Sequence, residues 1–258
     1  MKEVVVIFDL DGTLIDTIGD LSAAVEYALS QGGFPGHTVE EYRRMVGHGI
    51  RNLVTRALPE GTSEETIDLT LGRFVDYYTS HIDVLSRPYH GIHELLRNLS
   101  ACGVRLAVAS NKFQEGTQAL IHRFFEDIPF VKILGNAPGL PLKPDPAVVR
   151  IAMEAASAGT PPDLGRVHSR FAEAEYGRWP VVCQQIGPLA MPAVSLPDVK
   201  AVMVGDSATD IKTARNAGIP AVAVSWGFRP RTDLEAADAI ADTPEQLLEI
   251  IRIFTGKN

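Results

Sequence analysis

The sequence predicts an α/β fold: a doubly wound, Rossmann-like parallel sheet with a small inserted α-helical cap domain. Short apolar runs alternate with helical periodicities, the first run ends abruptly in two carboxylates, and a long stretch without strands separates the first two runs. Alternating strands and helices are typical of a parallel sheet covered on both faces. Ligands of such sheets bind at the carboxyl ends of the strands, so we expect the functional residues there.

The strands are expected at five apolar runs. Residues 4–8 read Val-Val-Val-Ile-Phe, a β-branched run that predicts a strand buried on both faces. The other four runs are 104–109, 130–134, 201–204 and 220–224. Residues 226–229, which follow the last run, are expected to pack against the edge of the core.

Helical spacing of apolar residues extends from 17 to 85, as at Leu21, Val25 and Leu29. An insertion of this size between two strands should form its own small domain over the carboxyl edge of the sheet. The predicted division is therefore a catalytic core of 1–16 and 87–258 and a helical cap of 17–86.

One stretch departs from this pattern. Residues 159–198 are rich in proline and weak in periodicity, and a loop of that length usually means function or disorder. Because the stretch connects a helix to a strand, we expect it at the amino edge of the sheet, opposite the catalytic edge. An extra surface helix near 166–177 is the favoured interpretation, and docking of a partner or self-association is the alternative.

Acidic residues follow two of the predicted strands. Asp9 and Asp11 come directly after 4–8, and Asp206 and Asp210 come after 201–204. Two carboxylates held close together repel each other unless a cation or a shared proton relieves them. Each acid alone is also an ordinary helix cap or loop residue, and only their occurrence together indicates a site.

Groups suited to binding an anion follow two of the other predicted strands, 104–109 and 130–134. Ser110 and Asn111 come after 104–109 and offer a hydroxyl and an amide. Lys143 precedes Pro144 and Pro146, which suit the first turn of a helix, and a helix amino terminus adds positive charge. Together these residues predict a phosphate site beside the acids.

The order of these motifs resembles the haloacid dehalogenase-like hydrolases with a small helical cap, and most closely their phosphoglycolate phosphatase branch. The resemblance rests on Asp9-Leu10-Asp11-Gly12-Thr13, Ser110, Lys143, and Gly205-Asp206 with Asp210, together with the segment 45–53 of the cap. It implies a Mg²⁺-dependent phosphatase that acts on a small phosphorylated metabolite, with 2-phosphoglycolate as the first candidate.

The resemblance also implies a role for each residue. Asp9 would attack phosphorus and form an aspartyl phosphate, and Asp11 would protonate the leaving group and then activate water. Mg²⁺ would be held by the carboxylates of Asp9 and Asp206 and the backbone carbonyl of Asp11, with Asp210 holding a water ligand. Ser110 and Lys143, with Asn111, would stabilise the phosphoryl oxygens.

Substrate selection is expected from the cap. His48 and Arg51 lie in a glycine-rich turn that opens a helix, and the planar guanidinium of Arg51 suits a substrate carboxylate. The competing interpretation is that both are solvated surface residues.

Single positions bear on two related activities, those of the dehalogenases and the sugar phosphate mutases. Dehalogenases lack an acid at the position of Asp11, and sugar phosphate mutases carry a histidine near position 21, where this chain has Leu21. A mutase and a pyrophosphatase stay open as alternatives, as does a non-catalytic protein that docks a partner through 159–198.

Composition excludes several partners. The net charge is −8 and no basic run could follow a phosphate backbone, so nucleic acid is not an expected partner. The first apolar run is too short for a signal peptide or a membrane span, which predicts no membrane partner and a cytoplasmic location. The two cysteines, Cys102 and Cys183, have no cluster around them and predict neither a disulfide nor a zinc site. The pattern does not predict an oligomeric state.

Overall fold

A six-stranded sheet forms the centre of the molecule, in the strand order β5-β4-β1-β6-β7-β8 with every neighbouring pair parallel. The computed structural model describes residues 3–158 and 199–256, so the segment 159–198, with its predicted helix, lies outside the described residues. The strands are β1 (Glu3–Phe8), β4 (Arg105–Phe113), β5 (Phe130–Asn136), β6 (Val199–Gly205), β7 (Ala221–Val224) and β8 (Ala239–Ala241). The predicted parallel α/β fold is confirmed, and β8 is a strand that the apolar runs did not indicate.

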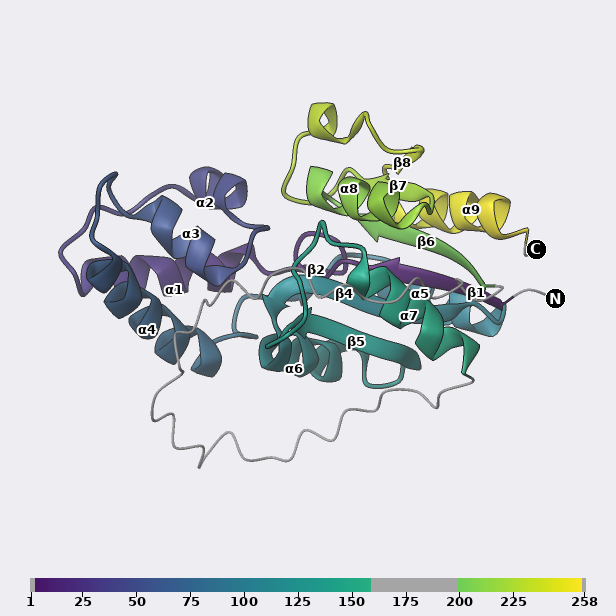
Figure 1. Ribbon diagram of the computed structural model, residues 1–258, viewed down its shortest axis with the longest axis horizontal. Helices are drawn as coiled ribbons and strands as arrows, with labels where there is room; N and C mark the ends of the chain where they lie inside the picture. The colour runs from purple at the N-terminus through teal and green to yellow at the C-terminus, as the bar shows by residue number, and fades with distance from the viewer. Residues whose placement is uncertain (1–2, 159–198, 257–258) are drawn as a thin grey trace.

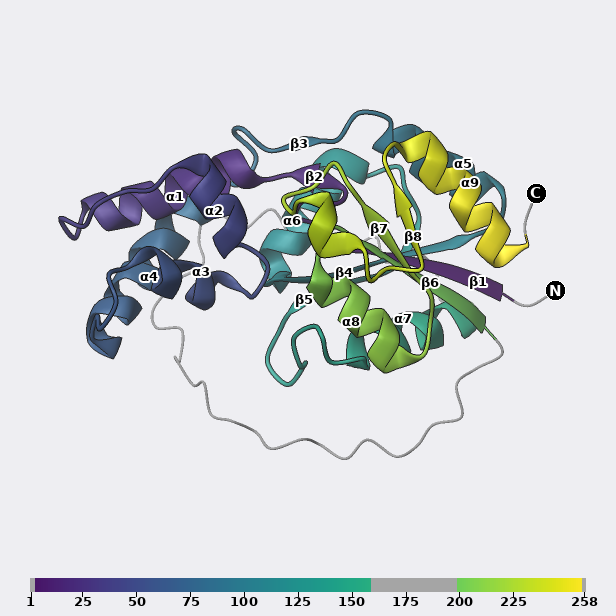
Figure 2. The same ribbon diagram turned by 90° about the horizontal axis from the view of Figure 1, so that it is seen from above.

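Helices cover both faces of this sheet, as Figure 2 shows. One face packs against α5 (Ile92–Ala101), α6 (Gln114–Phe125) and α9 (Pro244–Thr255), and the other against α7 (Ala147–Ser157) and α8 (Ala208–Ala217). Alternate residues of β1 point into the hydrophobic cores on the two faces of the sheet. Val4, Val6 and Phe8 pack into one core, and Val5 and Ile7 pack into the other. Burial on both faces explains why this strand reads as a continuous apolar run. A short 3-10 helix, η1 (Arg231–Leu234), follows β7.

Four helices lie beyond the carboxyl ends of the strands (Figure 1), and we call this group the cap. They are α1 (Ile18–Ser30), α2 (Val39–Met45), α3 (Ile50–Ala57) and α4 (Glu64–Ser80). The cap has a hydrophobic core of its own, to which the sheet-bearing part contributes Phe228. Thr38 and Glu41 form a capping box at the start of α2, and Ser63 caps α4.

The two connections between the cap and the sheet form an antiparallel ribbon. In it β2 (Ile15–Asp16) pairs with β3 (Arg87–Pro88). The buried carboxylate of Asp20 ties them further, because it accepts hydrogen bonds from the backbone N–H of Leu85 (2.8 Å) and from the N–H and hydroxyl of Ser86 (2.8 and 2.7 Å). The predicted bounds of the cap, 17 and 86, fall beside this ribbon, and the division into two domains there stays a prediction. None of the described helices has the length and apolar character needed to cross a membrane.

Candidate active site

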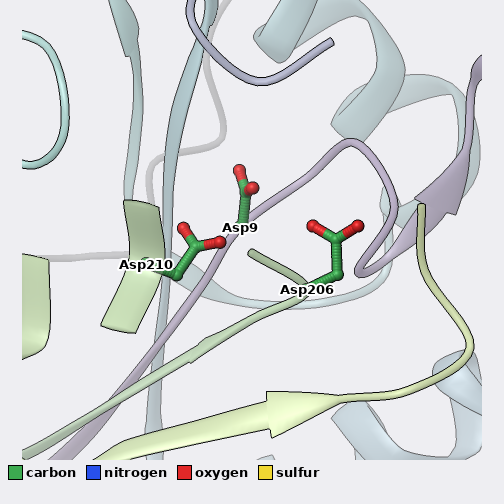
Figure 3. Close-up of side chains that lie close together, drawn as sticks. All are labelled: Asp9, Asp206 and Asp210. Carbon is green, nitrogen blue, oxygen red and sulfur yellow. The ribbon is translucent and has the colours of Figure 1, made fainter. Parts of the chain in front are cut away.

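The carboxylates of Asp9, Asp206 and Asp210 gather where β1 and β6 end (Figure 3). One oxygen from each lies within 4.8 Å of the others. Asp9 directly follows β1, Asp206 directly follows β6, and Asp210 lies in the first turn of α8. Three buried or half-buried acids at this spacing form a site that a cation would stabilise.

Asp206 is held in a space that only glycine leaves open. Its Oδ2 accepts a hydrogen bond from the Phe228 N–H at 2.7 Å. Gly12 has a φ of +82°, and a Cβ at Gly12 or at Gly227 would collide with the Asp206 side chain. Burial, with the negative charges of Asp9 and Asp210, raises the pKa of Asp206 to about 8.

One carboxylate oxygen of Asp9 is held by neighbouring groups. Its Oδ1 accepts hydrogen bonds from the Leu10 N–H at 2.7 Å and forms an ion pair with Lys143 Nζ at 2.9 Å. Burial raises the pKa of Asp9 to about 7, although Lys143 acts in the opposite direction. The other oxygen, Oδ2, is left for chemistry in the cavity.

Lys143 lies between two acids. Its Nζ contacts Asp210 Oδ1 at 2.7 Å in addition to Asp9, and both side chains of the Lys143–Asp210 pair are 2% exposed. Burial lowers the pKa of Lys143, but the attraction of Asp210 and Asp9 outweighs it and leaves that pKa raised. Asp210 Oδ2 accepts hydrogen bonds from the N–H and hydroxyl of Ser207. Because both of its oxygens already have partners, Asp210 is suited to holding Lys143.

Asn111 shapes the loop that carries Lys143. Its Oδ1 accepts from the Lys143 N–H at 2.8 Å, while its Nδ2 donates to the backbone carbonyls of Lys143 and Gly47, both at 3.1 Å. Asn111 therefore contacts the backbone of both the core and the cap. Ser110 Oγ accepts from the Lys112 N–H at 3.3 Å, which leaves its hydroxyl hydrogen for an acceptor in the cavity.

Asp11 lies between a hydroxyl and a lysine. Its Oδ1 accepts from Thr17 Oγ1 at 2.7 Å and lies 3.2 Å from Lys112 Nζ. Burial lowers the pKa of Lys112, while the nearby Asp11 acts to raise it. No role was predicted for this lysine from its place in the sequence.

The donor set fits magnesium. Four carboxylates (Asp9, Asp11, Asp206 and Asp210) face two ammonium groups (Lys112 and Lys143), so the described cluster carries an excess of negative charge. Burial is the main cause of the raised pKa values of Asp9 and Asp206, and the neighbouring acids raise both pKa values further. Oxygen-only donors are the ligands that this hard cation prefers. The carboxylate of Asp11 is not in the clustered group of Asp9, Asp206 and Asp210, and its predicted part in binding is through its backbone carbonyl.

A cavity joins these residues to the cap. It is lined on the core side by Asp9, Asp11, Asp206, Ser110 and Lys143, and on the cap side by residues of α1, α3 and the loop before α3. Residues at the carboxyl ends of the strands and residues of the cap thus line the same cavity.

Comparison with known proteins agrees with this geometry. A family model described as haloacid dehalogenase-like hydrolase matches residues 6–160, and a second, related hydrolase model matches residues 143–250. The chain belongs to the haloacid dehalogenase-like hydrolases. It is therefore an enzyme, and the non-catalytic alternative is set aside.

The relatives are phosphatases by name. A phosphoglycolate phosphatase from Mesorhizobium japonicum is 31% identical over 236 residues, which cover 90% of this chain and 86% of that protein. A phosphoglycolate phosphatase from Caulobacter vibrioides is 31% identical over 86% of this chain and 78% of its own length. A crystal structure from Lactobacillus delbrueckii subsp. bulgaricus, provisionally named a phosphoglycolate phosphatase, superposes with a TM-score of 0.76 at 31% identity and covers 97% of this chain and 99% of its own. This chain is a haloacid dehalogenase-like hydrolase similar to phosphoglycolate phosphatases.

The cap residues predicted to select substrate, His48 and Arg51, are not among the described residues that line the cavity of this hydrolase. Arg51 pairs with Asp68 and Glu64 of α4. Burial and the positive charge of Arg229 lower the pKa of His48. The geometry thus places Arg51 in a contact within the cap.

Arg229 is a lining residue that the sequence analysis missed. Residues 226–229 were expected only to pack the core edge, and Phe228 does pack against the cap core. Arg229, however, lines the cavity and donates hydrogen bonds to the carbonyls of Arg43 and Val46 in the cap. Arg229 lies five residues after the end of β7, at the same edge of the sheet as the catalytic motifs, and this position could have indicated that it lies near the site.

Proposed function

We propose that this chain is a magnesium-dependent phosphomonoesterase that hydrolyses a small phosphorylated metabolite through an aspartyl phosphate, with 2-phosphoglycolate as the first candidate. The proposal rests on how the two carboxylate oxygens of Asp9 are placed. Its Oδ1 is held by Leu10 and Lys143 while its Oδ2 is left for attack at the cavity. A carboxylate supported on one side in this way is a preorganised nucleophile.

The reaction is expected to run in two steps. In the first, Asp9 Oδ2 forms a bond to phosphorus, the bond from phosphorus to the ester oxygen breaks, and Asp11 gives its proton to the leaving alkoxide. In the second, Asp11 takes a proton from water, the water oxygen attacks phosphorus, and the acyl phosphate bond breaks to restore Asp9. Asp11 lies on the same cavity as Asp9, which is what both proton transfers require.

The surrounding groups supply charge and position. Lys143 and Ser110 lie on the cavity and are suited to binding the phosphoryl oxygens, where electrostatic stabilisation supplies most of the catalysis. Asn111 supports Lys143 through the backbone of its loop. Asp9 and Asp206, with the Asp11 carbonyl, would hold the metal ion, which when bound neutralises negative charge on the phosphate and the acids.

The substrate is supported by the relatives. Phosphoglycolate phosphatases at 31% identity cover most of this chain, which favours 2-phosphoglycolate over other phosphomonoesters. A sugar phosphate mutase and a pyrophosphatase would use the same nucleophile, so only turnover can separate the three activities. The segment 159–198 lies outside the described residues, so its role stays a prediction.

The test is a panel of phosphorylated compounds with Mg²⁺ present. It should include 2-phosphoglycolate, β-glucose 1-phosphate and pyrophosphate, with release of phosphate and formation of glucose 6-phosphate as separate readouts. We expect phosphate release to be fastest from 2-phosphoglycolate, and the variant Asp9→Asn to be folded but inactive, because an amide cannot attack phosphorus. Glucose 6-phosphate as the main product would replace the phosphatase with a mutase. Retention of more than a small percentage of the rate by Asp9→Asn would remove Asp9 as the nucleophile.

A further inference from the structure

Lys112 is a buried cation that the proposed reaction does not use. It lies near the end of β4, and its side chain is 1% exposed. Its Nζ lies 3.2 and 3.4 Å from the two carboxylate oxygens of Asp11 and donates a hydrogen bond to the hydroxyl of Tyr78 at 2.6 Å. Tyr78 belongs to helix α4 of the cap, so this ammonium connects the predicted acid and base of the core to the cap.

We propose that Lys112 is a positioning residue: it fixes Asp11 for proton transfer and ties that carboxylate to the cap through Tyr78. The inference rests on the proposed function, in which Asp11 is the acid and base. It goes further by naming two residues, Lys112 and Tyr78, that orient Asp11 for proton transfer. The rate of that transfer then depends on the position of the cap over the core.

The contacts of Asp11 support the positioning role. Thr17, in the connection that leads into α1, donates to Asp11 Oδ1, and Lys112 contacts the same oxygen from β4. Asp11 is thereby held by donors from two different elements. The stronger contacts are at Oδ1, and Oδ2 has the longer 3.4 Å contact with the same ammonium, so Oδ2 is the oxygen better placed to accept a leaving group or a water.

The contacts of Tyr78 support the link to the cap. Its ring is fully buried and stacks on Phe74 of the same helix, with centroids 5.3 Å apart. The ring also meets Phe113 of β4 edge to face, and Lys112 Nζ lies 4.6 Å from its centroid. The position of the hydroxyl is therefore set by packing on both sides of the boundary between cap and core. Displacement of α4 would remove one of the groups that hold the ammonium.

The strength of these contacts makes the link effective. A buried ammonium needs partners, and an ammonium has three N–H donors to satisfy. Asp11 and the Tyr78 hydroxyl accept from it, and the face of the Tyr78 ring adds a favourable interaction with the charge. Loss of the Tyr78 hydroxyl would leave one donor without its acceptor, so Lys112 would shift and Asp11 with it.

Comparing kcat/KM for substrates with different leaving groups separates a positioning role from a merely structural one. An alkoxide, as from 2-phosphoglycolate, needs a proton from the acid, whereas p-nitrophenolate leaves without one. The value of kcat/KM covers the steps up to loss of the leaving group, so it reports the first proton transfer alone. Lys112→Met should lower kcat/KM for 2-phosphoglycolate by about ten- to a hundredfold, a part of the factor that general acids supply. It should lower kcat/KM for p-nitrophenyl phosphate by less than about threefold, because that reaction does not use the proton.

A second variant removes only one atom. Tyr78→Phe keeps the buried ring and should lower kcat/KM in the same selective way by a smaller factor. In the Lys112→Met background it should have no further effect, because the hydroxyl acts through the ammonium. Tyr77→Phe is the matched control: it is the neighbouring residue on α4, and its ring stacks on Tyr27 and His81 at the cap surface. It should leave both substrates unchanged.

The outcomes separate this inference from the proposed function. A wild-type protein that turns over neither phosphate ester would remove the proposed function itself. If the wild type is active and Asp11→Asn loses the alkyl substrate selectively, but Lys112→Met and Tyr78→Phe lower both substrates equally, the positioning role is overturned while the phosphatase stands. If Lys112→Met does not fold, as judged by circular dichroism, Tyr78→Phe alone decides the question.

Discussion

Replacement of Lys143 by methionine tests the electrostatic balance of the site most directly. The lysine side chain is 2% exposed and lies 2.9 Å from Asp9 and 2.7 Å from Asp210. Removing one partner of a buried ion pair costs about 3–5 kcal/mol, because the remaining charge stays in a poorly solvated place. We expect the low end of that range, about 3 kcal/mol, since part of the cost is avoided when an acid takes up a proton.

The loss should therefore depend on pH. The pKa of Asp9 is already raised to about 7, and loss of Lys143 raises it further. In metal-free protein below about pH 5, Asp9 is protonated, so Lys143→Met should lower the free energy of unfolding less than it does at about pH 8. At about pH 8 Asp9 is charged and no longer has its buried partner. Urea unfolding followed by circular dichroism at the two pH values measures the difference. A loss of 3 kcal/mol corresponds to a fall in Tm of about 6–12 °C for a protein of this size.

A double variant and a surface control test whether the loss of stability comes from the buried charges. Asp210→Asn removes the second charge, so Lys143→Met combined with Asp210→Asn should be more stable than Lys143→Met alone. Lys212→Met on the exposed face of α8 should change the free energy of unfolding by less than about 0.5 kcal/mol. Phosphate release should also fall by about a hundred- to a thousandfold in Lys143→Met, the usual cost of a lost electrostatic group. A loss of stability below about 1 kcal/mol at both pH values would show that the two ion pairs do not balance the site.

Three further predictions concern the metal and the cap. Excess chelator should stop hydrolysis, Mg²⁺ should restore it, and Ca²⁺ should inhibit because its looser coordination misplaces the reacting oxygen; full activity in chelator would contradict this. The rise in Tm caused by Mg²⁺ should grow from about pH 5 to about pH 8, because Asp9 and Asp206, with pKa values raised to about 7 and about 8, must lose protons to bind it; a rise independent of pH would exclude them as ligands. Because Arg51 pairs with Asp68 and Glu64, Arg51→Ala should change KM equally for 2-phosphoglycolate and for an ester without a carboxylate; a rise of about ten- to a hundredfold for 2-phosphoglycolate alone would restore Arg51 as the residue that selects the carboxylate.

The residues of the core were accessible to prediction because their positions follow from one geometric rule. Each buried strand is an apolar run, and parallel strands bring the residues that follow them to one edge. Asp9 and Asp206 satisfy this rule directly. The strand β8 escaped detection because three residues, Ala239–Ala241, carry too little pattern, and the ribbon of β2 and β3 is shorter still. Strand β4 runs on to Phe113, past the predicted end at 109, since polar residues 110–112 continue it beside β5 with a shift of register.

The contacts between cap and core could not be predicted in this way, and they decide how the site works. Asn111 reaches the Gly47 carbonyl, Lys112 the Tyr78 hydroxyl, and Arg229 the carbonyls of Arg43 and Val46. Most of these acceptors are backbone carbonyls, which every residue carries, so no residue type in the cap identifies the partner. The pairing depends on how the cap lies over the sheet, a quantity that periodicity within one helix does not contain. Since three core residues at the sheet edge each contact the cap, a change in the cap can alter Asp11, the Lys143 loop and the cavity wall at once. Variants of the cap should therefore change catalysis even where they touch no substrate.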